Sequence, residues 1–151
     1  MNHRRIAAAT ATVWLVSIPI GAVIHHGVLG SVYAANAAAF RPDTDVVQRL
    51  PIGYAGLVLG FWAAAVMYAK TSPRSSSILG GIQFGLLIGA IVVSLAVVWN
   101  YVTLPISVAV GVAEALECMF LSAVYGAIIG VIYRPAGAVR DRTPLESGRA
   151  V

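Results

Sequence analysis

Long apolar runs alternate with short polar segments along the chain. No Lys, Arg, Asp or Glu occurs in residues 6–40 or in residues 75–113. An apolar run of about 20 residues is long enough to cross the hydrocarbon core of a bilayer as a helix. The pattern therefore predicts an all-α integral membrane protein, a bundle of four spanning helices at about residues 6–29, 51–69, 78–101 and 105–133.

Prolines and polar residues mark the limits of these helices. Pro51 and Pro105 each suit the first turn of a helix, where a missing N–H leaves no acceptor unsatisfied. Asp43 and Asp45 precede the second helix and are interpreted as solvated turn residues. Residues 1–134 are expected to form one transmembrane domain, and residues 135–151, with their prolines and arginines, a disordered cytoplasmic tail.

Basic residues divide unequally between the two ends of four antiparallel spans. Only Arg41 and Arg49 fall at one end, and the other eight fall at the opposite end. Cytoplasmic loops carry an excess of Lys and Arg, so both termini are predicted to lie in the cytoplasm of a bacterial inner membrane. The basic start before a long apolar run favours a retained first span over a cleaved signal peptide. The eight residues are Arg4, Arg5, Lys70, Arg74, Arg134, Arg140, Arg142 and Arg149.

Composition narrows the possible functions. Charged residues make up 11% of the chain, against about 25% in an ordinary soluble domain. The net charge of +4 does not indicate a nucleic-acid partner, because the basic residues flank apolar runs and form no patch with aromatic residues. Cys118 is the only cysteine, which excludes an intramolecular disulfide and a C-x-x-C site. We interpret Cys118 as a small buried apolar residue.

Small residues recur at helical spacing in every predicted span. In lipid, helices associate by close backbone approach at small residues rather than by the hydrophobic effect. These rows therefore predict the packing faces of the bundle, and glycine faces that also support self-association. The rows are Ser17–Gly21–His25, Gly56–Gly60, Gly81–Gly85–Gly89 and Glu114–Cys118–Ser122–Gly126–Gly130.

Two carboxyl groups interrupt the last apolar run. Glu114 and Glu117 lie three residues apart, so their side chains lie on neighbouring faces of one helix. Glu114 is about nine residues, or roughly 13 Å, from the outer end of its span. A carboxylate facing lipid is costly, so both side chains are expected to point into the bundle.

Polar residues of the other spans are expected at the same depth. His25 and His26 come near the outer end of the first span, and Asn100 ends the third. Tyr54 lies in the first turn of the second predicted span. Adjacent histidines point about 100° apart on a helix, so one should face the bundle and the other the headgroups. Periodicity alone does not decide which.

Three interpretations of this outer cluster stay open. A His–Glu pair can fix the register of the helices as a buried structural contact. Imidazole and carboxylate also suit a transition metal or proton transfer. A site for a ligand, lipid or larger complex is the third. The metal pattern is incomplete, because H-H and E-x-x-E lack the i, i+4 spacing of H-E-x-x-H. The candidate metal ligands are His26, Glu117, His25 and Glu114.

Short motifs give the chain a resemblance to a known group of proteins. They are H-G-V-L-G at 26–30, Y-A at 33–34, F-R-P at 40–42, Q-F-G-L-L-I-G at 83–89 and G-V-I-Y-R-P at 130–135. Over about residues 13–135 the chain resembles small bacterial four-helix inner-membrane proteins of unknown function. The resemblance implies a four-helix bundle and favours His26 and Glu117 over His25 and Glu114. It implies no activity.

The function expected from these patterns is structural rather than enzymatic. The sequence offers no nucleophile–base constellation, and we expect a non-enzymatic structural or accessory membrane protein. The alternative is a small transporter, channel or metal-binding protein that uses the outer cluster. The expected partners are the lipid bilayer and a second copy or a larger membrane complex.

Overall fold

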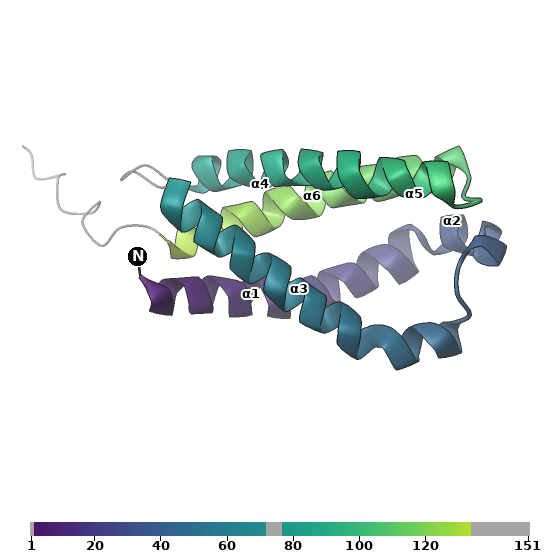
Figure 1. Cartoon of the computed structure of the whole chain (residues 1–151), viewed down its shortest axis with the longest axis horizontal. Coiled ribbons are helices and arrows are strands. Elements are labelled where there is room, and N and C mark those ends of the chain that lie inside the picture. Colours follow the sequence, from purple (N-terminus) through teal and green to yellow (C-terminus); the bar gives the residue numbers. More distant parts are fainter. Residues whose placement is uncertain (1, 72–76, 134–151) are drawn as a thin grey trace, which may run out of the picture.

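The computed structural model describes residues 2–71 and 77–133, and these residues fold into helices and short connections without strands. Figure 1 shows α4 and α6 running together along the long axis, with α3 crossing obliquely in this view. In chain order the helical segments are α1 His3–Ala22, the π-helix η1 Val23–Val28, α2 Gly30–Ala35, the 3-10 turn η2 Ala37–Ala39, α3 Asp43–Thr71, α4 Ile78–Val92, the π-helix η3 Val93–Val97, α5 Val98–Thr103 and α6 Val108–Ile132.

Within the described residues, four continuous helical stretches are long and apolar enough to cross a membrane. They are α1 with η1 (His3–Val28), α3, α4 with η3 and α5 (Ile78–Thr103), and α6. The prediction of an all-α chain with four such helices is thus confirmed. The expectation of a disordered tail from residue 135 concerns residues outside those described.

Polar caps fix where three of these stretches begin. Asn2 Oδ1 accepts from Arg5 N at 3.2 Å, and Ser77 Oγ accepts from Gly80 N at 3.0 Å. Ser107 Oγ accepts from Val110 N at the start of α6. Each cap satisfies one of the backbone donors that the first turn leaves free.

The second long helix, α3, begins eight residues before the proline that was expected to open it. Pro42 O accepts the first helical hydrogen bonds, and Pro51 lies inside the helix. Asp43 and Asp45, interpreted above as turn residues, occupy the first turn, where their negative charge suits the helix dipole. Asp45 also lies 3.7 Å from an Arg41 nitrogen. The two aspartates therefore mark the start of α3.

Antiparallel α4 and α6 make the closest contact in the molecule (Figure 1). A Cβ atom added at Gly85 would collide with the carbonyl oxygen of Ser122, and one added at Gly126 would collide with that of Gly81. A Cβ at Gly130 would lie 2.8 Å from Ser77 O. Only glycine permits this backbone approach, which is how small residues hold helices together in lipid.

The buried core lies at one end of the molecule. We call this the His3 end, where α1 begins and α6 ends. The opposite end, where Asn36 Oδ1 accepts from Ser107 N at 3.3 Å, is called the Asn36 end. The core combines the first half of α1 with the last turns of α3 and α6, so the His3 end is closed by apolar packing. Its members are Ile6, Ala9, Val13, Ala65, Tyr68 and Ile129.

Other glycines do not pack inside the chain. Added Cβ atoms at Gly21, Gly56 and Gly60 would have nothing within 4 Å. Gly21, Gly56 and Gly60 therefore serve no close helix contact among the described residues, unlike the glycines that join α4 to α6.

Alanine substitution separates the two kinds of glycine. We expect Gly85→Ala to destabilise the protein by about 1–3 kcal/mol, because the added methyl overpacks the α4–α6 contact. Gly60→Ala should be neutral or stabilising by up to about 1 kcal/mol, because alanine favours the helix and meets no neighbour. Thermal unfolding of both variants in one mild detergent measures the difference. Equal effects of the two substitutions would contradict the packing described here.

Candidate functional site

A contact between an imidazole and a carboxyl group joins the first and last spans near the Asn36 end. His25 Nε2 lies 3.2 Å from Glu117 Oε1. The Glu117 side chain is only 9% exposed, whereas that of His25 is 51% exposed. The carboxylate is therefore enclosed by protein, and the imidazole covers it from the more open side.

The π-helical segment η1 carries the histidine of this pair. Its wider turn is closed by a hydrogen bond from Leu29 N to Ile24 O at 2.8 Å, five residues back. A π-helical turn shifts the register of the side chains that follow it and is often found at functional sites. In this segment His25 is the residue that reaches α6.

The neighbouring His26 is exposed. The resemblance to other membrane proteins favours His26 as the partner of Glu117, but the structure gives that place to His25. The two rings belong to consecutive residues and point in different directions, as expected for a helix. His26 therefore offers a matched control for experiments on His25.

The connection after the first span covers the pair with aromatic rings. The Tyr33 ring lies against His25 at a centroid distance of 5.3 Å, and Phe40 meets the edge of Tyr33 at 5.4 Å. Asn36, between them in sequence, holds the connection to the start of α6 through its bond from Ser107 N. Tyr33 was not among the candidate site residues predicted from the sequence.

Glu114 lies one turn before Glu117 on the same helix. Its side chain is partly buried, and its charge interacts with those of Glu117 and His25. Two carboxyl groups thus share the vicinity of one imidazole. When all three groups are ionised, this part of the site carries an excess negative charge.

The remaining sequence candidates lie apart from the pair. Tyr54 packs edge-on against Trp14, in the contact between α1 and α3, with ring centroids 6.4 Å apart. Asn100 is exposed on α5, where its carbonyl accepts from Leu104 N. Cys118 is partly buried, and its thiol lies 3.9 Å from Gly89 O in the α4–α6 contact. These three residues serve helix packing or lie at the surface.

The chemistry open to the site follows from its donors. Within residues 2–71 and 77–133, no three His, Cys, Asp or Glu side chains come together as a metal-binding group. One imidazole and one carboxylate make a strong hydrogen-bonded pair and can exchange a proton. The geometry therefore fits a pair that joins helices more closely than it fits a resident metal centre.

Titration of Tyr33 tests how the site is covered. Burial raises the pKa of the Tyr33 hydroxyl to about 12, and the charges of Glu117 and Glu114 add to the rise. We expect Tyr33 to add little phenolate to a pH difference spectrum recorded near pH 11, and therefore Tyr33→Phe to leave that spectrum nearly unchanged. Folding raises the pKa of Tyr33 above its usual value of about 10. The stability contributed by the neutral Tyr33 hydroxyl is therefore complete below about pH 10 and is lost as the pH rises through 12. A Tyr33 that ionises with the exposed tyrosines would contradict the covered position.

Comparison of the chain with protein-family models, curated proteins and solved structures finds no match. The case for a function therefore depends on the geometry of the four spans and of the His25–Glu117 pair.

Proposed function

We propose that the chain is a non-enzymatic, multi-pass protein of a bacterial inner membrane with a structural or accessory role. In this proposal the His25–Glu117 pair locks the first helical hairpin to the second at the Asn36 end. The observation that carries it is the 3.2 Å contact between an enclosed carboxylate and an imidazole from a different hairpin.

Energetics support a locking role. A carboxylate at membrane depth is costly unless it is paired or reaches water. Glu117 therefore stabilises the native arrangement only when His25 lies against it. Glycines already join α4 to α6. The His25–Glu117 pair adds a polar link from α6 to η1, which the glycine contact does not provide.

Charge distribution supports an orientation with both termini in the cytoplasm. Among the described residues, Arg4, Arg5 and Lys70 lie at the His3 end, and Arg41 and Arg49 belong to the connection and first turns at the Asn36 end. Arg74 and the arginines from 134 onward lie outside the described residues. The positive-inside rule then directs the His3 end to the cytoplasm and the polar pair to the outer leaflet.

Removing one member of the pair tests the locking role. We expect His25→Ala to lower stability by about 1–3 kcal/mol, because an enclosed carboxylate loses its hydrogen-bonding partner. His26→Ala should change stability by less than about 0.5 kcal/mol, as for an ordinary surface position. The measurement is thermal unfolding in detergent together with the abundance of the protein in membranes.

The double variant His25→Phe, Glu117→Leu distinguishes a structural pair from one needed for chemistry. Replacing a buried ion pair by apolar residues of similar size is often neutral. We therefore expect the double variant to regain most of the stability and abundance that His25→Ala loses. A double variant as unstable as the single one would argue against a role limited to joining helices.

A second candidate function is the handling of a cation or proton at the outer face. The exposed half of His25 and the additional charge of Glu114 favour it, since both leave the site open to one more cation. Elemental analysis of the purified protein, with the His25→Ala variant as control, separates the candidates. Stoichiometric metal that is lost in the variant would replace the structural proposal by a metal-binding one.

An accessory role implies contact with a second copy or with a larger membrane complex, and we propose that such a contact uses α3. Only 6% of the apolar stretch of α3 is buried, against 28% of the apolar stretch of the first span. Gly56 and Gly60 add an open, close-packing face. We expect Gly56→Leu with Gly60→Leu to reduce the mass of the detergent-solubilised particle measured by light scattering. An unchanged mass above that of one chain would exclude this face.

A further inference from the structure

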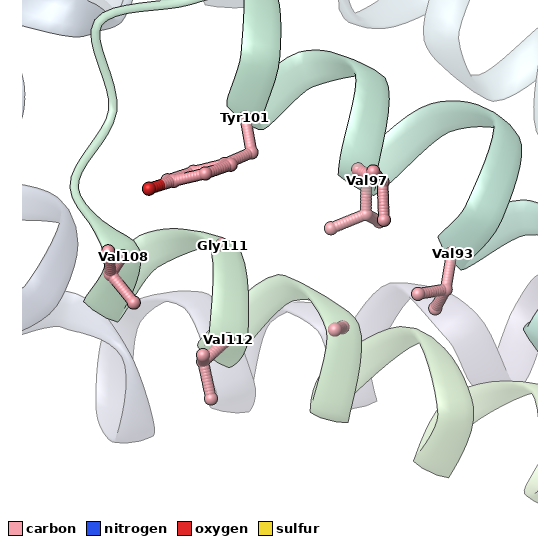
Figure 2. A pocket seen from close by; sticks show the side chains of 8 residues that line it. Val93, Val97, Tyr101, Val108, Gly111 and Val112 are labelled. Carbon is pink, nitrogen blue, oxygen red and sulfur yellow. The ribbon is translucent and has the colours of Figure 1, made fainter.

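A cavity of about 250 Å³ lies between η3, α5 and the first half of α6. Figure 2 shows the side chains that line it, which come from both sides of the connection between α5 and α6. Their exposed surface in the cavity is almost entirely carbon. The lining residues are Val93, Val97, Val98, Tyr101, Val108, Gly111, Val112 and Ala115.

The cavity exists because the helices separate beyond their glycine contact. From Gly81 to Gly89 the α4 backbone lies against α6, and the π-helix η3 follows at Val93. Gly111 has no side chain to project from α6 into the cavity. A Cβ atom added there would lie 3.3 Å from the Tyr101 ring.

Such a cavity calls for an apolar occupant. The cavity is open on one side rather than enclosed, and its aliphatic lining offers water almost no hydrogen-bonding partners. Leaving it empty forfeits the dispersion contacts of the side chains that line it. An apolar molecule that enters from the side regains those contacts.

The position of the cavity indicates which apolar molecule this is. It opens between two membrane-spanning helices, and Val98, Val108 and Val112 are more than half exposed on its rim. It runs from Val108, at the end of the span, toward Val93 and Ala115 farther in. When these helices span a bilayer, the open side of the cavity faces hydrocarbon and its length follows the helices.

The aromatic residues at its mouth mark the level of the headgroups. Tyr101 and Trp99 lie in the last turns before the connection and are both exposed. Tyr and Trp favour the membrane interface, where one part of the ring is in hydrocarbon and the polar atom meets water. Figure 2 shows the Tyr101 ring extending between α5 and α6 with its hydroxyl directed toward the Val108 end.

We propose that this cavity holds one alkyl chain of a bilayer phospholipid, with its headgroup at the level of Tyr101. The lipid would lie against α6, on the side next to η3 and α5. This inference does not depend on the role of the His25–Glu117 pair.

Native mass spectrometry of the detergent-solubilised protein provides the first test. We expect the parent protein to carry one phospholipid, and Ala115→Leu, which fills the cavity, to reduce the occupancy by about tenfold or more. Ala109→Leu is the matched control, because Ala109 is exposed on the same helix and does not line the cavity. Equal lipid retention in the two variants, or none in the parent, would overturn the proposal.

Photo-crosslinking in a bilayer provides a second test that needs no variant. The probe is phosphatidylcholine with a diazirine in the middle of one acyl chain, incorporated in vesicles with the parent protein. We expect labelling of Val93, Gly111 and Val112 to saturate at a low fraction of probe, whereas the exposed Leu59 and Leu95 label in proportion to it. Proportional labelling at all these residues would overturn the proposal.

Discussion

The close approach of α4 and α6 is the contact on which the rest of the structure depends. Backbone atoms of the two helices meet at Gly81, Gly85 and Gly126, where no other residue fits. Lipid gives helices no hydrophobic reason to associate, so this contact supplies dispersion forces that longer side chains would prevent. It fixes the rotation of α6 about its own axis. The direction of every other side chain on α6 follows from that rotation.

The rotation of α6 explains how two carboxyl groups avoid both lipid and the glycine contact. Each residue of an α-helix advances by about 100°, so a row of i+4 positions turns by about 40° at each step. The row from Gly130 to Glu114 has four such steps, and Glu114 therefore lies about 160° round the helix from Gly130. Glu117 lies outside this row, about 60° round the helix from Glu114, and meets His25 of the first span. The glycines and Glu114 thus belong to one sequence row and to different faces.

Much of the architecture could be predicted from the sequence, and the parts that could not share a physical cause. Apolar length predicts the four long helices, and Gly81, Gly85 and Gly126 carry the expected close contact. The start of α3 at Asp43 was missed because an aspartate suits both a turn and the first turn of a helix. The choice of His25 over His26 depends on a π-helical turn that no periodicity announces. The unused glycines of α3 look the same in sequence as the packed glycines of α4.

The two π-helices give the molecule different character at its two ends. At the His3 end, α1 and α4 follow ordinary helical spacing and pack against α3 and α6 through Val13, Tyr68 and the glycines. Each then changes register, at η1 and at η3, before it reaches the Asn36 end. A regular helix would continue the same face along its whole length. The wider turns let η1 present an imidazole to Glu117 and accompany the separation of α5 from α6. Regular helices thus build the closed His3 end. The His25–Glu117 pair and the apolar cavity both lie at or beyond the π-helical turns.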